Sequence, residues 1–508
     1  RLAPMGRWLW RHPLVLWLPL QAALLFHNLE LLPLWTDERH TVQTVSRPLA
    51  EIGREVASDI HPPLYFFLLR GWVQLPLPGS PVARMRALSV LWVLLAAVFI
   101  DRWWLARAEG WKRWWFLCLW TFSPCLLLYA RMARSYTMQV FFASLAVAAA
   151  LSFLRKPGEV KRLLGYAGCA AALLYTHYLP GAAILVAVAL ILAWPMVRRR
   201  EWRLLLPLAL ANLVVAAAYL PWLLAVGGAV RKWVGQAGVY QVVPSAALDH
   251  VVKLAYWFVS FSFGESLPMA AMLAALVLAP VIVWLLCKGL MPAPEWLDLI
   301  LLAGLAGYVG ASRWVSFPFV PARLLFLFPF FLFLLLEGCG RSRRLGRAVC
   351  AGLLALSFCS THSYFHKQDF LNKGYVAPFD EMAALVLHDA SPENTLVILD
   401  TYNTDVYPLL DRLGPSATVL LLRDVSVFEA VEEARRRGGA KAIWCLRNTH
   451  DLSPGGLNRR LEAQLAASNE VRRHLFQPYS AAERLVIRLV GWPEQPTHFY
   501  QALEMRAR

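Results

Sequence analysis

Residues 204–224 read LLLPLALANLVVAAAYLPWLL, an apolar stretch without one charged side chain. A helix needs about 20 predominantly apolar residues to cross a bilayer, so this stretch predicts a membrane-spanning helix. Similar stretches recur, and the predicted spans are residues 13–34, 87–106, 113–129, 135–154, 162–178, 180–197, 203–224, 266–287, 296–314, 322–338 and 347–365. The sequence therefore predicts a polytopic α-helical membrane protein with about eleven to thirteen spans.

The composition agrees with a membrane protein. Of the 508 residues, 58% are apolar and 16% are charged, against about 45–50% and about 25% in soluble domains. Charged and turn-forming residues return after residue 365, which predicts a membrane domain at 1–365 and a separate domain at 366–508. The net charge of +17 comes from short basic runs between apolar segments. Such runs are typical of membrane anchors, and without a zinc-finger or helix-turn-helix signature we expect no nucleic acid partner.

Two shorter apolar segments lie at 61–77 and 249–263. Each is compatible with a spanning helix or with a re-entrant segment. If 61–77 does not cross, the basic runs at 102–113, 155–162, 198–203 and 341–347 all share the side of the N-terminus. That side is then cytoplasmic by the positive-inside rule. We therefore predict a multi-pass protein of the cell inner membrane with a cytoplasmic N-terminus, a first external loop at 35–86 and an extracytoplasmic C-terminal domain.

Four arginines contradict this charge pattern. Arg84, Arg86, Arg131 and Arg134 fall on short connections of the predicted outer face. A single arginine there could extend to lipid headgroups. Four on one face favour a phosphate-binding rim, because the planar guanidinium binds phosphate oxygens in pairs.

The first external loop begins and ends with acidic residues. It opens with Trp35-Thr36-Asp37-Glu38-Arg39-His40 and closes with Asp59-Ile60-His61-Pro62-Pro63. A solvated loop with internal Asp–Arg pairs is one interpretation. The other is catalytic, because transfer from a sugar phosphate needs a base for the incoming hydroxyl and cations for the departing phosphate. The absence of a GxGxxG or GxxxxGK[ST] motif favours a lipid-linked donor over a soluble nucleotide sugar.

The order of these motifs resembles one known family. The chain is similar to the bacterial protein-mannosyltransferase-like glycosyltransferases of the GT-C superfamily, which include protein O-mannosyltransferases and the ArnT-like lipid A aminoarabinose transferases. The resemblance covers the membrane domain and rests on Asp37-Glu38-Arg39, Asp59-Ile60-His61-Pro62-Pro63-Leu64-Tyr65, the pair Arg84 and Arg86, Arg131-Met132-Ala133-Arg134-Ser135-Tyr136, Tyr175-Thr176-His177-Tyr178 and Pro321-Ala322-Arg323.

The resemblance implies an inverting transfer of a sugar from a polyprenyl phosphate to a hydroxyl acceptor on a lipid, glycan or protein. It implies Asp37 as the catalytic base with Glu38 beside it. Implied donor-phosphate ligands are Arg84, Arg86, Arg131 and Arg134, and implied substrate contacts are Asp59, His61, Tyr136, His177 and Arg323. His61 stands where aminoarabinose transferases carry lysine, which favours a plain hexose donor such as mannose. The chain lacks the β-trefoil insertion of eukaryotic protein mannosyltransferases, which disfavours protein acceptors of that kind.

The C-terminal domain has an alternating α/β pattern. Predicted strands are 395–399, 417–422, 442–446 and 485–489, and predicted helices are Val427–Arg437 and Arg459–Ala467. Alternation of this type favours a largely parallel sheet.

Other ligands and functions stay open at this stage. We expect no resident cofactor, although a divalent cation at Asp37, Glu38 and Asp59 is compatible with their oxygen ligands. If the loop at 35–40 is extended, Asp37 and Glu38 point to opposite sides and have different roles. A transporter would also have many helices but would carry ionisable residues at mid-membrane or an internal repeat. A non-catalytic polysaccharide-assembly protein that binds lipid-linked sugars would not need Asp37.

Overall fold

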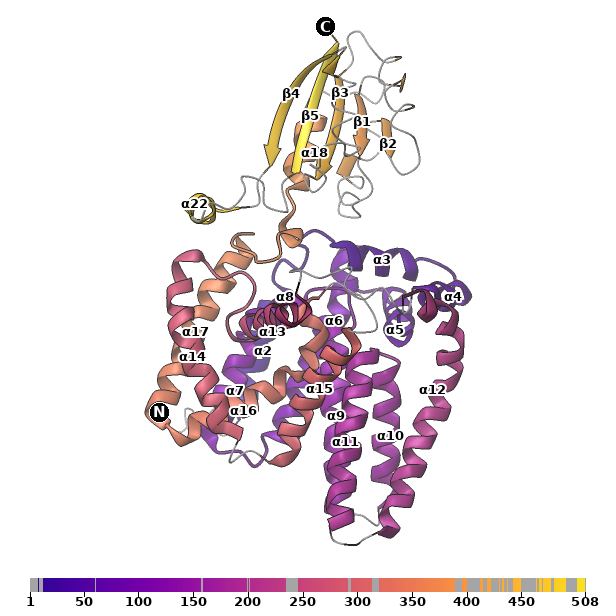
Figure 1. The fold of residues 1–508 in the computed structure, drawn as a ribbon, viewed down its shortest axis with the longest axis vertical. Helices are drawn as coiled ribbons and strands as arrows, with labels where there is room; N and C mark the ends of the chain where they lie inside the picture. The colour runs from indigo at the N-terminus through magenta and orange to yellow at the C-terminus, as the bar shows by residue number, and fades with distance from the viewer. Residues whose placement is uncertain are drawn as a thin grey trace. The chain divides into compact units, whose positions relative to one another are not determined.

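The computed structural model describes residues 8 and 12–388, except 60, 157–158, 199, 201, 234–244, 291–293 and 313–318. Beyond these it describes 395–399, 412–413, 418–421, 442–448, 469–476, 479–489 and 500–507, with a few isolated residues between. The chain forms two compact units (Figure 1). A helical unit comprises 1–30, 40–267 and 271–362, and a C-terminal unit comprises 31–39, 268–270 and 363–508.

The helical unit is built from apolar helices joined by short connections. Its elements are α2 (Leu14–Phe26), α4 (Leu49–Ser58), α5 (Leu64–Val73), α6 (Pro81–Phe99), η1 (Ile100–Trp104), α7 (Gly110–Thr121), α8 (Pro124–Ala130), α9 (Tyr136–Arg155), α10 (Val160–Leu174), α11 (Tyr178–Arg198), η2 (Trp202–Leu204), α12 (Leu205–Trp233), α13 (Ala246–Phe263), α14 (Met269–Leu290), α15 (Glu295–Ser312), η3 (Pro321–Leu327), α16 (Phe328–Arg341) and α17 (Arg343–Phe365). Helix α3 (Thr36–Val45) begins in the C-terminal unit and continues into the helical unit.

Seven of the described helical segments are long and apolar enough to cross a membrane. They are Pro81–Trp104, Tyr136–Arg155, Tyr178–Arg198, Trp202–Arg231, Met269–Leu290, Pro321–Arg341 and Arg343–Phe365. The other predicted spans, at 13–34, 113–129, 162–178 and 296–314, also fall on helices, but these are shorter or interrupted. The predicted fold class, a polytopic α-helical protein, is confirmed.

The predicted span at 113–129 is divided by a helix start. The side chain of Ser123 accepts a hydrogen bond from the Leu126 amide at 3.2 Å, and Pro124 occupies the first position of α8. Serine caps helix N-termini and proline suits the first turn, so α7 ends before a new helix begins. Helix α5 has 10 residues, or about 15 Å, which is too short to cross a hydrocarbon core of about 30 Å.

Two of the basic runs lie at one end of the helical unit. Lys112 contacts Glu337 at 2.8 Å, and Arg343 contacts Glu109 at 3.5 Å. Arg113 also binds both oxygens of the buried Asp101, at 2.7 and 2.8 Å. The runs at 102–113 and 341–347 therefore share one end, while their cytoplasmic orientation stays a prediction.

Helices α14 and α16 approach each other through glycines. A Cβ atom on Gly338 would overlap the backbone carbonyl of Leu285, and one on Gly289 would overlap the carbonyl of Leu334. Small residues allow membrane helices to pack backbone against backbone. Glycine is therefore required at both positions for this crossing.

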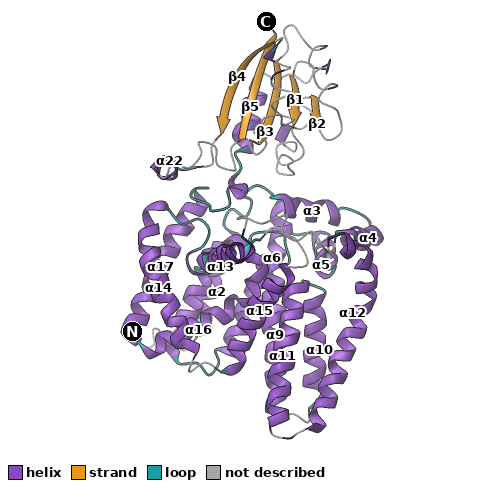
Figure 2. Cartoon of the chain, in the orientation of Figure 1, coloured by secondary structure: helices purple, strands orange, loops and turns teal. Residues whose placement is uncertain are grey.

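The C-terminal unit contains the described strands (Figure 2). These are β1 (Thr395–Leu399), β2 (Thr418–Leu421), β3 (Ala442–Asn448), β4 (Asn469–Phe476) and β5 (Tyr500–Ala507), in the order β2-β1-β3-β5-β4. Strands β2, β1 and β3 are parallel, with Ile398 of β1 opposite Leu420 and Cys445. Strand β5 runs antiparallel to β3 and β4. The unit also has η4 (Lys373–Val376), α18 (Phe379–Leu387) and α22 (Ala481–Leu489), and Met382 and Val386 of α18 share its core with Val397.

Three predicted strands are confirmed, but two features of the prediction are wrong. The sheet is mixed rather than largely parallel, because β5 runs antiparallel to its neighbours β3 and β4. Neither β4 nor β5 was predicted. Residues 485–489 belong to helix α22, which begins with a capping box: the Ser480 amide donates to Glu483 Oε2 at 2.8 Å and the Glu483 amide donates to Ser480 Oγ at 3.3 Å. A short apolar run does not by itself distinguish strand from helix. The predicted helices 427–437 and 459–467 lie mostly outside the described residues.

Candidate active site

Six side chains from distant parts of the helical unit gather near helix ends. We call them the histidine–arginine cluster: His40, Asp59, His61, Arg134, His177 and Arg323. They come from α3, from the connection between α4 and α5, from the turns before α9 and α11, and from η3. Five of these residues were predicted substrate or phosphate contacts, and the sequence interpretation gave His40 no role.

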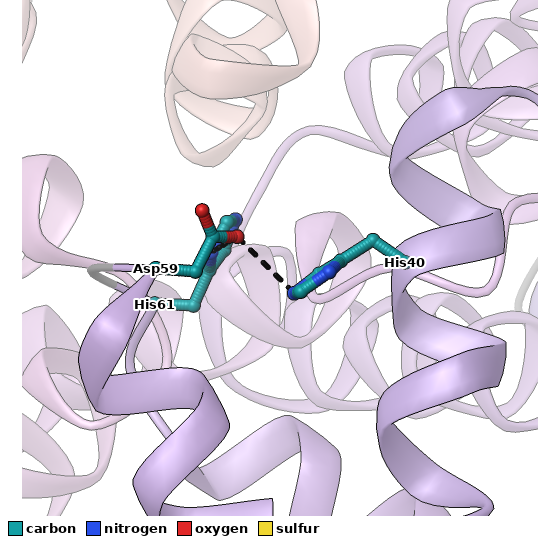
Figure 3. A group of neighbouring side chains, drawn as sticks. All are labelled: His40, Asp59 and His61. Atoms are coloured by element: carbon teal, nitrogen blue, oxygen red, sulfur yellow. Dashed lines mark ion pairs between the residues drawn. The ribbon is translucent and has the colours of Figure 1, made fainter. Parts of the chain in front are cut away.

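The centre of the cluster is the carboxylate of Asp59. Its Oδ2 lies 3.1 Å from His40 Nε2 and 3.0 Å from His61 Nδ1. His40 points from α3 toward Asp59 and His61 (Figure 3). On the other side of the His61 ring, Nε2 lies 3.0 Å from Arg134 Nη2. Arginine can only donate, so His61 Nε2 accepts and its proton is on Nδ1.

Helix ends hold Asp59 and His61 in place. Asp59 is the C-cap of α4 and its amide donates to the Glu55 carbonyl at 3.1 Å, while the His61 amide donates to Val56 at 2.9 Å. Pro62 and Pro63 then lead into α5, as proline suits helix starts. The Leu64 amide donates to the Tyr175 carbonyl at 3.0 Å, which ties this connection to the turn that carries His177.

The environment keeps two imidazoles neutral and Asp59 ionised. Burial lowers the pKa of His40, although Asp59 opposes this effect. Burial lowers the pKa of His177 well below its ordinary value, and Arg323, His61 and Arg134 lower it further. Burial alone would raise the pKa of Asp59, but His61, His40 and Arg134 together bring it below its usual range. His40 and His177 therefore add no positive charge to that of Arg134 and Arg323.

Arg134 is buried in this cluster. Its Nη1 donates to Thr41 Oγ1 at 3.0 Å, and its guanidinium carbon lies 5.9 Å from the centre of the Tyr136 ring. Arg134 and Tyr136 were both predicted site residues. The structure places them together at the start of α9.

Arg86 and Arg131 bind backbone instead. Each is only 2% exposed. Arg131 donates to the carbonyls of Leu24, at 3.5 Å, and Asn28, and Arg86 donates to the carbonyl of Leu29 at 2.9 Å. The last carbonyls of a helix lack partners within it, so these guanidiniums satisfy the C-terminal end of α2 and the residues just after it. Arg84 is half-buried, and its backbone carbonyl accepts a hydrogen bond from Trp72 at 2.8 Å.

The predicted base and its neighbour lie on a helix. The condition of an extended chain does not hold, because Asp37 and Glu38 occupy the first turn of α3. Acidic residues are favourable there because they face the positive end of the helix dipole. Asp37 is half-buried, whereas Glu38 is only 1% exposed. Both belong to the segment 31–39 of the C-terminal unit.

Two buried polar groups among the described residues of the helical unit were not predicted from the sequence. Asp249 and Lys253 of α13 form a buried ion pair at 2.6 Å. Their spacing of four residues in an apolar segment is the signal that could have found them. Glu265 is also buried and accepts hydrogen bonds from Tyr129, Tyr256 and, at 2.8 Å, Ser260. Tyr256 and Ser260 are close to Glu265 in sequence, but Tyr129 lies 136 residues away, so no local pattern marks the complete set.

No protein-family model and no curated protein sequence matches the chain. Among solved structures, the apo form of ArnT from Cupriavidus metallidurans is 13% identical with a TM-score of 0.50, and the match covers 86% of this chain and 93% of that one. The chain has a GT-C-type fold. ArnT bound to undecaprenyl phosphate is 13% identical with a TM-score of 0.49, covering 96% and 97% of the two chains. The oligosaccharyltransferase AglB from Archaeoglobus fulgidus is 9% identical with a TM-score of 0.44, covering 94% and 74%.

Proposed function

We propose that the protein is a membrane glycosyltransferase that moves a sugar from a polyprenyl-phosphate donor to a hydroxyl acceptor at the outer face of the inner membrane. The observation that carries this proposal is the histidine–arginine cluster. It combines the buried guanidinium of Arg134 and the half-buried Arg323 with neutral imidazoles near helix ends. Guanidinium groups bind phosphate oxygens through charge-assisted hydrogen bonds. The acceptor is a lipid, a glycan or a protein.

In the proposed reaction, the bond between the sugar C1 and the phosphate oxygen breaks while the acceptor oxygen bonds to C1 from the opposite face. The configuration at C1 is therefore inverted. Arg134 and Arg323 stabilise the negative charge that the departing polyprenyl phosphate gains. A base removes the proton of the acceptor hydroxyl, and Asp37 is the residue that we assign to this step.

Different exposure supports different roles for the two acids of α3. Asp37 is half-buried and keeps access to a substrate hydroxyl. Glu38 is buried, so it suits the positioning of neighbouring groups better than direct contact with an acceptor. His61 is held between Asp59 and Arg134. Because histidine stands here in place of the lysine of aminoarabinose transferases, we propose a plain hexose, such as mannose, as the donor sugar.

The test is a transfer assay with the purified full-length protein in liposomes. The donors are undecaprenyl-phosphate mannose and undecaprenyl-phosphate glucose, and the readout is release of undecaprenyl phosphate. Arg134→Gln removes the cation, while Arg102→Gln is the matched control, because Arg102 is 73% exposed and lies in η1, beyond the other end of α6. We expect Arg134→Gln to lower kcat/KM for the donor by about 10- to 100-fold, since a charge-assisted contact contributes about 1.5–3 kcal/mol. Unchanged turnover at limiting donor would remove Arg134 from the site.

A deletion strain tests the function without a chosen donor. Loss of the transferase should leave its polyprenyl-phosphate sugar unused, so that this lipid accumulates while one envelope glycan loses a residue. Mass spectrometry of both fractions identifies the sugar and the acceptor. Unchanged polyprenyl-linked sugars and unchanged glycans would contradict the proposal.

A further inference from the structure

We propose that His40, Asp59 and His61 form a zinc-binding site, and that occupation of this site releases Arg134 from its hydrogen bond with His61. The first part concerns the helical unit alone. The use of the released Arg134 for a donor phosphate rests on the proposed function.

The three side chains present the right donor atoms. One ring nitrogen of His40, one of His61 and an oxygen of Asp59 all lie within 4.8 Å of one another. In a tetrahedral site with bonds of about 2.0–2.1 Å to zinc, neighbouring donor atoms are about 3.3 Å apart. The distances of 3.1 and 3.0 Å from Asp59 to the two ring nitrogens are close to this value. Small side-chain movements therefore suffice to accommodate the ion.

The chemistry of the set favours zinc. Two imidazoles with one carboxylate are a ligand combination of zinc sites, whereas magnesium and calcium prefer oxygen ligands only. Three protein ligands leave a fourth position open, which a water or a phosphate oxygen can occupy. The ligands come from α3 and from the connection that follows α4, so the ion would join these two segments.

The His61 ring supplies a second observation. Its Nδ1 is buried and has no hydrogen bond of acceptable geometry, although Asp59 is only 3.0 Å away. Buried polar atoms are rarely left in this state, and an ion bound at Nδ1 would give the atom a partner.

Zinc and Arg134 compete through the tautomer of His61. While Arg134 donates to Nε2, the ring proton is on Nδ1. A zinc ion takes the lone pair of Nδ1, so the proton of the neutral ring moves to Nε2. Two N–H donors would then face each other across 3.0 Å, and the ion would repel the guanidinium. Arg134 keeps its contact with Thr41 and loses the one with His61, and a contact with a donor phosphate replaces the lost one.

The first experiment measures zinc alone on the full-length protein, purified in detergent and stripped with a chelator. Calorimetry and metal analysis after gel filtration give affinity and stoichiometry. We expect about one zinc per chain, with binding lost in His40→Ala and Asp59→Asn and retained in the matched control His12→Ala. If His40→Ala does not give a monodisperse protein, His61→Gln takes its place. No stoichiometric zinc in the wild type, or equal affinity in the ligand variants, would overturn the site.

The variant Arg134→Gln should change the zinc affinity in the direction opposite to that of the ligand variants. This variant removes the cation that repels zinc, and it removes the hydrogen bond that keeps the His61 proton on Nδ1. Together these changes should tighten zinc binding by about 10-fold. A residue with a merely structural role would not raise the affinity when it is removed. Unchanged or weaker zinc binding in Arg134→Gln would contradict the competition.

The second experiment measures the affinity for undecaprenyl phosphate with and without zinc. By linkage, the ion should tighten this binding by about 5- to 150-fold in the wild type, but not in Arg134→Gln. Equal affinity with and without zinc would refute the release of Arg134 to the phosphate. The zinc titration uses no donor, so its failure would leave the transferase proposal intact, and failure of sugar transfer would leave the zinc site intact.

Discussion

Replacement of Arg131 by methionine should weaken the fold at the end of α2. Arg131 is buried, and its guanidinium contacts the carbonyls of Leu24 and Asn28. Methionine keeps much of the apolar stem and removes the donors. Each buried carbonyl left without a partner costs about 1–3 kcal/mol. Because the contact with Leu24 is long, at 3.5 Å, we expect a total loss of about 2–4 kcal/mol.

Amide hydrogen exchange measures this loss where it occurs. A tenfold increase in the equilibrium constant for local opening corresponds to about 1.4 kcal/mol. Amides of residues 22–29 should therefore exchange about 30- to 700-fold faster. The apparent melting temperature in detergent, compared at one scan rate, should fall as well. Arg86→Met should also speed exchange in this region, because Arg86 donates to the carbonyl of Leu29.

Arg84→Met is the matched control. Arg84 is half-buried on the same helix, and the hydrogen bond to its backbone carbonyl does not depend on its side chain. We expect its exchange at 22–29 to match the wild type. Wild-type exchange in Arg131→Met, together with a raised KM for the donor, would refute the structural role and return Arg131 to the phosphate site predicted from the sequence.

Three further predictions concern other parts of the chain. Asp37→Asn should lower turnover by about 10² or more with donor binding retained, in line with the usual contribution of a general base. Near-normal activity in Asp37→Asn with loss of activity in Glu38→Gln would assign the base to Glu38. Activity in both variants would reject the mechanism. Burial raises the pKa of Glu265 above its ordinary 4.5, so the folded state binds the extra proton and stability falls as pH rises from 4.5 toward the raised value. Glu265→Gln should therefore remove that slope in the melting temperature measured from pH 4 to 8, and an unchanged slope would show that another group causes it. Gly338→Ala should destabilise the protein by about 3 kcal/mol or more through overlap with the Leu285 carbonyl, whereas Gly310→Ala, with no atom within 4 Å of its Cβ, should melt like the wild type.

The sequence predicted what depends on local composition. Long charge-free stretches located the helices, and β-branched runs located β1, β2 and β3. The strand β4 was missed because NEVRRHLF is dominated by polar residues. The helix at 481–489 was missed because its apolar core is short, although Ser480 and Glu483 formed a readable capping box.

Part of the candidate site was predictable because local motifs mark some of its residues. Motifs pointed to His61, Arg134, His177 and Arg323, and the structure brings these residues together. No local pattern distinguishes an arginine of the histidine–arginine cluster from one that binds a helix end. Arg86 and Arg131 differ from Arg134 in the groups that they contact. Their partners Leu29 and Leu24 lie 57 and 107 residues earlier in the chain, so the neighbouring sequence does not reveal them. His40 lacked a signal because its partner, Asp59, belongs to the next helix.

The glycine crossing of α14 and α16 has a mechanical consequence. With Gly289 against the Leu334 carbonyl and Gly338 against the Leu285 carbonyl, the two backbones touch at reciprocal points. Neither an acyl chain nor a side chain fits between them there, and sliding either helix by one residue would bring a Cβ atom against a carbonyl. The two helices can therefore turn about the crossing but cannot shift along it. A rearrangement that involves these two helices can change the angle between them but must keep both glycines at the contact.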